Sequence, residues 1–310
     1  MRENALLQHV YAGNAELTRR FPGVTIPPGD DMGAIEVAAG ALLVAVDQLA
    51  DGVHVDTATA PLDLVGRKAI TRNLSDVAAM AAEPVAAVVA ATLPRGFGED
   101  RAAALFDAMR TTAEGFGCPL VGGDIGVWDH PLLVSVTVLA RPFPGAGVPP
   151  VTRDGSLPGD AIYVTGHLGG SLPTGHHLTF TPRLDAARAL VTDPKTRPRA
   201  MVDLSDGIAQ DLPRLMDHAE LDAAALPIRE GTPDTPPLPA WRHALADGED
   251  YELLFTAPPD APIPAALLDG SLPVTRIGTV ADAGGHVVVA PDGNRVGLKT
   301  LDAAGWEHTA

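Results

Sequence analysis

The chain has 310 residues, 46% of them hydrophobic, and carries 39 acidic against 22 basic side chains, for a formal net charge of -17. Global disorder is excluded because enough apolar surface is available to form a core. The acidic balance argues against non-specific nucleic-acid binding and is compatible with metal ions, or with anions bridged by metal ions. The single cysteine, Cys118, excludes an intramolecular disulfide and a cysteine metal cluster.

Length and targeting signals further restrict the interpretation. At the usual ~100–200 residues per domain, the chain predicts about two domains. The N-terminal sequence "MRENALLQHVYAG" has no long apolar core and no cleavage-site pattern. No stretch reaches the ~18 uncharged apolar residues of a membrane-spanning helix. With one cysteine, these features predict a cytoplasmic protein.

The first half of the chain alternates segments of strand and helix periodicity. In order, we expect strands at 33–40 and 41–47 forming a hairpin, a helix at 61–82, a buried strand at 85–93, a helix at 98–117, a short strand at 119–124 and a strand at 132–140. The following segment, 141–160, is rich in proline and glycine and is typical of a linker or a long crossover.

The alternation restarts after this segment. We expect strands at 161–166 and 199–204, a helix at 206–220, and strands at 251–257, 274–280 and 286–290. The sequence therefore predicts a mixed α/β protein of two α/β domains, residues 1–140 and 141–310.

Aspartates recur beside glycine or serine at the ends of apolar segments. "PPGDDMG" places Asp30 and Asp31 together at a tight turn, where they need a positive partner. The other candidates are Asp47, Asp76, Asp124, Asp203 and Asp206. Strand ends of α/β sheets are where ligands bind, and converging carboxylates need cations to stay ionised. Oxygen-only ligands favour Mg²⁺ first and Ca²⁺ second.

Each of these acids also has a purely structural interpretation. Asp206 or Ser205 could cap a helix, Asp76 could cap "VAAMAA", and Asp30 could form an Asx turn. For the set as a whole we favour metal binding.

No P-loop or kinase glycine-rich motif occurs, and Lys68 and Lys195 are the lysines near motifs. A phosphate chain would therefore be neutralised mainly by metal ions, with help from glycine-turn amides and a helix N-terminus.

An ordered series of motifs carries a family resemblance. The series "GDD", "DQLADGVHVD", "GRKA", "NLSDVAAM", "LVGGD", "RDGSLPGDAIYVTGHLGGS", "DLSDGIAQDL" and "GEDYELLFT" resembles the thiamine-monophosphate kinase family, within the superfamily of phosphoribosyl-aminoimidazole synthetase and selenophosphate synthetase. The resemblance runs from about residue 3 to Trp306. It implies a homodimer formed through the N-terminal domains, and transfer of the ATP γ-phosphate directly onto thiamine monophosphate, giving thiamine diphosphate and ADP.

The resemblance also implies roles for individual residues. Several Mg²⁺ ions would be held by Asp30, Asp47, Asp76, Asp124, Asp203 and Asp206. ATP would contact Phe106, Gly123, Asp124, Arg153 and Ser205, and thiamine phosphate would face His54, Glu249 and Trp306. Two of the substrate residues have alternatives: Trp306 could instead be a packing residue, and His54 could be a hydrogen-bonded strand-end histidine. No strong general base is implied, because a phosphate monoester is already nucleophilic near pH 7.

The sequence departs from the family pattern at several positions. Hydroxyl residues usually precede the strand aspartate, where this chain has Ala45 and Val46, so a side-chain metal contact is lost there. Ile125 replaces a threonine, Asp247 replaces a glycine, and "SLPTGHHLTFTPR" is shorter than the usual alanine-rich helix. The departures at single positions motivate one rival hypothesis, a non-catalytic paralogue that binds nucleotide or thiamine phosphate, although retention of every main aspartate argues against it. A second rival hypothesis keeps the fold and changes the substrate to another small phosphate or carboxylate.

Overall fold

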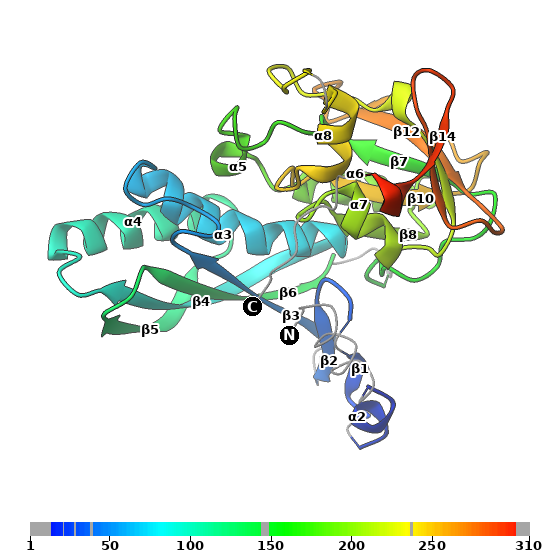
Figure 1. The fold of residues 1–310 in the computed structure, drawn as a ribbon. Coiled ribbons are helices and arrows are strands. Elements are labelled where there is room, and N and C mark those ends of the chain that lie inside the picture. Colours follow the sequence, from blue (N-terminus) through cyan, green and yellow to red (C-terminus); the bar gives the residue numbers. More distant parts are fainter. Residues whose placement is uncertain are drawn as a thin grey trace.

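The structure is a computed structural model that describes residues 14–20, 22–27, 29–37, 40–143, 149–235 and 238–301. Within them, the strands form two β-sheets with helices packed against them, which confirms the expected mixed α/β architecture (Figure 1). The first sheet lies within residues 24–142 and the second within 161–297. Among the described residues, no helix combines the length and apolar character needed to cross a membrane.

The first sheet has the strand order β1-β2-β3-β6-β4-β5. Its strands are β1 (Val24–Ile26), β2 (Gly33–Val37), β3 (Gly40–Ala50), β4 (Ala82–Pro94), β5 (Leu120–Trp128) and β6 (Leu133–Pro142), and its helices are α2 (Asn14–Arg20), α3 (Leu62–Ala79) and α4 (Glu99–Gly115). β2 and β3 form the predicted hairpin, and α4 connects the parallel pair β4 and β5.

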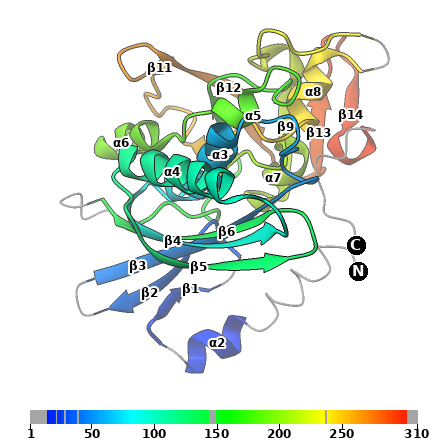
Figure 2. The ribbon, with the colours of Figure 1, turned by 90° about the vertical axis from the view of Figure 1, so that its left-hand side faces the viewer.

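Helices α3 and α4 lie together on one face of this sheet (Figure 2). Side chains alternate along its strands: in β6, Val134, Val136 and Val138 are buried under the helices, whereas Ser135 and Thr137 face the other side. On that other side, α2 is the only described helix, and it lies by β1 at the sheet margin (Figure 2). We call this the open face of the first sheet.

The second sheet has the order β14-β13-β9-β12-β7-β10-β8, with β11 paired to β12. Its strands are β7 (Ala161–Thr165), β8 (Ala200–Asp203), β9 (Ala219–Asp222), β10 (Leu253–Ala257), β11 (Ala266–Leu267), β12 (Leu272–Val280), β13 (His286–Val289) and β14 (Arg295–Gly297). The helices in this half are α5 (His176–Thr179), α6 (Leu184–Thr192), α7 (Ile208–Asp211) and α8 (Ala240–Ala246), with 3₁₀ turns at Leu212–Arg214, Ala223–Ala225 and Leu298–Thr300.

The C-terminal end of α3 joins the two halves. Ala78 and Ala79 are fully buried in one apolar cluster with Leu190 of α6 and Phe255 of β10. Alanines at this end let the second half approach the helix closely, and burial of the larger side chains stabilises the contact. Because Asp76 lies one turn before this contact, its carboxylate is held between the two sheets.

Three expectations about elements were wrong. A continuous helix does not form at 206–220: Pro213, which lacks an amide hydrogen, stands in a 3₁₀ turn after α7, and the chain then enters β9 to pair with β12. Asp47 and Asp124 do not end their strands, since β3 continues to Ala50 and β5 to Trp128. Hydrogen bonding to the neighbouring strands extends both elements beyond the apolar runs that predicted them.

Candidate functional site

A cavity of about 730 Å³ lies between the two halves of the molecule. The first half lines it with Asp30, with the turn from Gly52 to Asp56 and with side chains of α3. The second half contributes Arg153, the segments 203–206 and 247–251, and Leu172, His177 and Leu178. The cavity is therefore bounded by acids, arginines and a smaller set of apolar side chains.

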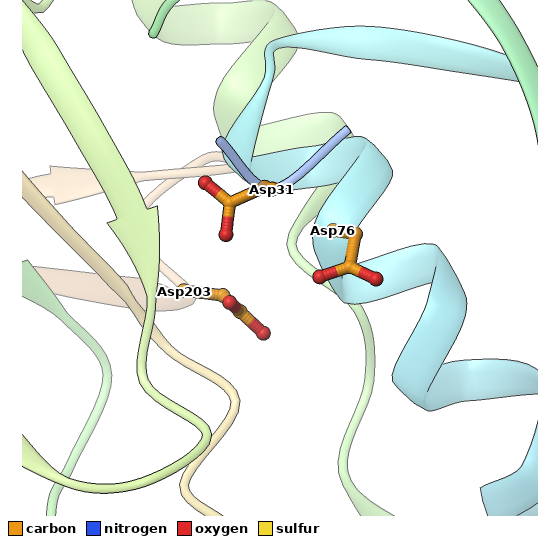
Figure 3. Close-up of side chains that lie close together, drawn as sticks. All are labelled: Asp31, Asp76 and Asp203. Atoms are coloured by element: carbon orange, nitrogen blue, oxygen red, sulfur yellow. The ribbon is translucent and has the colours of Figure 1, made fainter. Parts of the chain in front are cut away.

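Three carboxylates converge at this cavity, and two of them, Asp76 and Asp203, line it. Asp31 follows a tight turn, Asp76 lies on α3 and Asp203 ends β8 (Figure 3). Each offers an oxygen, and the three oxygens lie within 4.8 Å of one another. Asp31 and Asp203 are buried, and Asp76 is partly exposed. We refer to Asp31, Asp76 and Asp203 as the carboxylate cluster.

Burial and mutual repulsion disfavour ionisation in this region. Burial, followed by repulsion from Asp31, raises the pKa of Asp203 to about 7 and that of Asp30 to about 6. Burial, followed by repulsion from Asp47 and Asp203, raises the pKa of Asp76 well above its usual value. A bound cation would reverse this cost, and an all-oxygen donor set suits Mg²⁺. The cluster therefore fits a divalent metal ion chemically.

Arg153 is the positive partner of the adjacent aspartates Asp30 and Asp31. Its Nη2 and Nε donate to the two carboxylate oxygens of Asp31 at 2.6 and 3.2 Å. Its backbone amide donates to Oδ2 of Asp30 at 3.1 Å, and Nη1 reaches the carbonyl of Gly29. A second carboxylate of the cluster is held by a serine, because Oγ of Ser75 donates to Asp203 at 2.7 Å. One arginine faces several acids, so part of the negative charge stays uncompensated.

Two further predicted metal ligands line the same cavity beside arginines. Asp47 lies 3.5 Å from Nε of Arg72, measured to its Oδ2 atom. Asp206 accepts from Nη2 of Arg214 at 2.7 Å. Ser205 lines the cavity next to Asp206. The structure thus brings Asp30, Asp47, Asp76, Asp203 and Asp206 to one cavity, as the sequence predicts for a shared site.

Other predicted residues lie elsewhere. Phe106 is half-exposed on α4, and Gly123 and Asp124 lie on β5, the edge strand far from the second sheet (Figure 1). None of the three lines the cavity of the single chain. Asp124 pairs with Ala90 in the β4–β5 ladder and points to the open face. Trp306 lies outside the described residues.

The two predicted substrate residues that the structure describes, His54 and Glu249, line the cavity from opposite halves. Nδ1 of His54 accepts from the amide of Ala50 at 3.0 Å, which fixes the turn. Glu249 has a left-handed backbone, with φ of 55°, and its amide donates to the carbonyl of Ser205 at 2.8 Å. Both residues are thus held by the backbone near the cavity wall.

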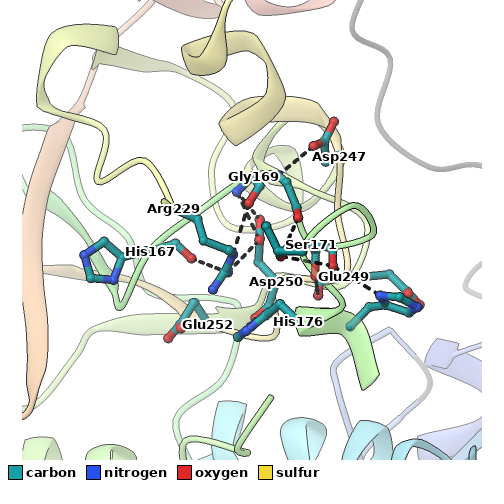
Figure 4. Close-up of polar contacts among 12 residues, drawn as sticks. His167, Gly169, Ser171, His176, Arg229, Asp247, Glu249, Asp250 and Glu252 are labelled. Atoms are coloured by element: carbon teal, nitrogen blue, oxygen red, sulfur yellow. Dashed lines mark hydrogen bonds and ion pairs between the residues drawn. The ribbon is translucent and has the colours of Figure 1, made fainter. Parts of the chain in front are cut away.

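Polar contacts hold the loop around Glu249 in place (Figure 4). Oγ of Ser171 donates to the Glu249 carbonyl at 2.5 Å. Buried Asp250 accepts from Nη2 of Arg229 and from the amide of Gly169, both at 3.0 Å. Asp247, one of the departures from the family pattern, accepts from the amide of Gly170 at 2.8 Å. Asp247 therefore stabilises the conformation of the loop.

Sequence reasoning missed several residues of the site. The sequence places Asp30 and Asp31 side by side, and only the fold shows that Asp31 is the one that joins Asp76 and Asp203 in the cluster. Arg72 and Arg214 also line the cavity. Their sequence signal was their place in "GRKAITRNLSD" and "DGIAQDLPRL", next to the predicted acids. Ala45 and Val46 do not line the cavity, so the lost hydroxyls leave its described wall unchanged.

Comparisons with known proteins show the family of this chain. The family model described as "AIR synthase related protein, N-terminal domain" matches residues 29–141. A thiamine-monophosphate kinase of Rhodopirellula baltica is 34% identical over 282 residues, 85% of each chain, and that of Escherichia coli K12 is 33% identical over 91% of each. The solved structure described as "AaThiL complexed with AMPPCP and TMP" covers 96% of this chain and 98% of its own, at 26% identity and a TM-score of 0.74. The chain belongs to the thiamine-monophosphate kinase family.

Proposed function

We propose that this protein transfers the γ-phosphoryl group of ATP to the phosphate of thiamine monophosphate, producing thiamine diphosphate and ADP. The observation that carries the proposal is the cavity between the halves, in a chain 34% identical to a thiamine-monophosphate kinase. Acids that can hold cations line this cavity together with Glu249 and His54. A solved relative at 26% identity holds both AMPPCP and TMP.

Magnesium is the proposed metal, held by the carboxylate cluster with further oxygen ligands from Asp30, Asp47 and Asp206. When bound, Mg²⁺ supplies neutralisation of the charge on the triphosphate and on the transferring phosphoryl group. The side chains of the chain itself hold these carboxylates in place: Arg153 orients Asp31, and Ser75 orients Asp203.

Alignment is the other contribution that the chain makes. The attacking phosphate of thiamine monophosphate needs no general base, because it is largely ionised near pH 7. The protein therefore has to bring two polyanions into line and exclude water. Arg72, Arg153 and Arg214 line the cavity and supply the fixed positive charge. Ser205, at the turn after β8, is our candidate for a nucleotide contact, together with Arg153.

We also propose that the protein is a homodimer formed through the open face of the first sheet. Val46 is 60% exposed on this face, and Val88 and Asp124 also lie on it. Apolar side chains on a sheet face that the described residues leave exposed favour pairing with a second copy. In such a dimer the proposed nucleotide residues Gly123 and Asp124 lie at or near the interface, which makes their distance from the cavity of one chain understandable. Replacing Val46 with arginine should then yield monomers in sedimentation velocity.

The activity test is direct. The protein is incubated with ATP, Mg²⁺ and thiamine monophosphate, and thiamine diphosphate is measured by chromatography. Product formation excludes a purely binding role, and ATP consumption only with another acceptor would select a different substrate.

We also propose that the reaction takes place in the cytoplasm, where ATP is supplied. The division into two domains, residues 1–140 and 141–310, is likewise our proposal. Limited proteolysis tests it, because cleavage within the segment 141–160 should release the two domains.

A further inference from the structure

Lys68 is a lysine whose position the proposed reaction does not explain. It lies on α3, and its side chain is fully buried. Its ammonium group donates to Oε2 of Glu249 at 2.5 Å and to the carbonyl of His54 at 2.6 Å. A buried ammonium is costly unless it is paired, and here both partners belong to residues that line the cavity.

These two contacts connect the halves at the cavity wall. His54 belongs to the turn that follows β3 in the first half, and Glu249 belongs to the loop that precedes β10 in the second. The Lys68 ammonium group therefore holds His54 and Glu249 at the same time. Because Lys68 does not line the cavity, its ammonium group binds to other groups of the protein and not to a phosphate.

The loop that carries Glu249 needs such support. Glu249 and Tyr251 both have left-handed backbones, with φ of 55° and 51°. A left-handed backbone costs a residue other than glycine about 1–2 kcal/mol, so the loop keeps this shape only while its contacts persist. Without Lys68, the Glu249 carboxylate would face an acidic cavity with no ammonium beside it, and rotation toward solvent would relieve the repulsion.

We propose that Lys68 is a positioning residue for the part of the cavity wall that Glu249 and His54 form, acting through Glu249 and the His54 turn to set the shape that receives thiamine monophosphate. This inference rests on the proposed function. It separates Lys68 from residues that contact the substrate, and it predicts an effect on one substrate and not on the other.

The test compares Lys68→Met with a matched control, Arg183→Met. Arg183 forms an equally buried ion pair with Glu252, with Nη2 2.5 Å from Oε1, but neither residue lines the cavity. Lys68→Met should raise KM for thiamine monophosphate at least tenfold and leave KM for ATP within twofold. Arg183→Met should lower the melting temperature and leave the ratio of the two KM values unchanged.

A double mutant establishes that Lys68 acts through Glu249. If it does, Lys68→Met combined with Glu249→Gln should raise KM for thiamine monophosphate no more than the larger single effect, and not by the product of the two. Lys68→Arg, which keeps the charge but changes its reach, should give a smaller rise and carries the test if Lys68→Met does not fold.

The outcomes separate the inference from the proposed function. A wild-type protein that makes thiamine diphosphate, with Lys68→Met or Lys68→Arg showing an unchanged KM for thiamine monophosphate, overturns the role of Lys68 alone. Equal increases in KM for both substrates also overturn it, because they indicate a general loss of structure. A wild-type protein that makes no thiamine diphosphate refutes the proposed function and removes the basis of the inference with it.

Discussion

Replacing Asp76 with asparagine should stabilise the protein in the absence of divalent cations and weaken its response to Mg²⁺. Asp76 lies with Asp31 and Asp203 in a cluster whose oxygens are within 4.8 Å of one another. At that separation and an effective dielectric constant of about 20, two ionised carboxylates repel by about 3.5 kcal/mol. Asparagine has nearly the same shape as aspartate and carries no charge, so it removes the repulsions of Asp76 with Asp47, Asp203 and Asp31.

The net gain in unfolding free energy is smaller than this sum. The carboxyl groups already avoid part of the repulsion by binding protons, and Arg153 offsets part of the rest. We expect about 1–2 kcal/mol, which corresponds to a rise in melting temperature of about 2–8 °C. Saturating Mg²⁺ and ATP should raise the melting temperature of the wild type more than that of the variant, and kcat of the variant should fall by orders of magnitude.

The assay is a thermal melt of both proteins in EDTA, in Mg²⁺, and in Mg²⁺ with ATP. Asp160→Asn is the matched control: Asp160 is buried but pairs with Arg199 at 3.3 Å, away from the cavity. It should lose stability by the same amount in all three conditions. An Asp76→Asn variant that is destabilised equally in EDTA and in Mg²⁺ would refute the reasoning, because the cluster would then not be held against repulsion.

Three further predictions follow from the site. ATP should raise the melting temperature only when Mg²⁺ is present, since a triphosphate entering an acidic cavity is otherwise repelled; equal shifts with and without Mg²⁺ would contradict this. If the Trp306 indole stacks on the thiazolium, Trp306→Ala should weaken the binding of thiamine monophosphate by about 0.5–2 kcal/mol, measured as a rise in its KM. A lowered melting temperature with an unchanged KM would show that Trp306 is a packing residue. Burial, together with Arg229 and Arg183, lowers the pKa of His176 to about 4, so the stability that its neutral ring contributes is present above pH 6.5 and is lost as the pH falls toward 4. The full shift is worth about 3 kcal/mol, which screening of the half-buried ring reduces to about 1–2 kcal/mol, so urea unfolding of His176→Asn should show a shallower loss of stability over that range than wild type.

The sequence was sufficient for most elements of the fold and for much of the site. Periodicity located the β2–β3 hairpin, α3 and α4, because each buries one regular face. Aspartates at the ends of apolar segments, three of them beside glycine or serine, identified five of the acids that line the cavity. Such residues are recognisable because a carboxylate within an apolar segment is costly unless a ligand or partner uses it.

What the sequence could not supply depends on contacts between distant segments. The ends of β3 and β5 are set by hydrogen bonds to β6 and β4, so Asp47 and Asp124 fall within strands and not at their ends. The pairing of Arg153 with Asp31 spans 122 positions, and that of Lys68 with Glu249 spans 181. No local pattern encodes such pairs, because they arise only when the second sheet packs on α3.

Apolar contacts between the halves explain how so acidic a chain keeps this cavity formed. Repulsion among Asp31, Asp76 and Asp203 opposes the contact between the halves, whereas fully buried Phe255 and Leu190 favour it by about 1.5–3 kcal/mol each. The apolar contact is therefore comparable to the repulsion of an ionised pair, and the cluster stays assembled before any cation binds. Ligands that are already assembled bind a cation without a further cost of ordering. In the proposed reaction, metal ions held by the cluster would neutralise the phosphate groups, so that the buried lysine serves the shape of the cavity.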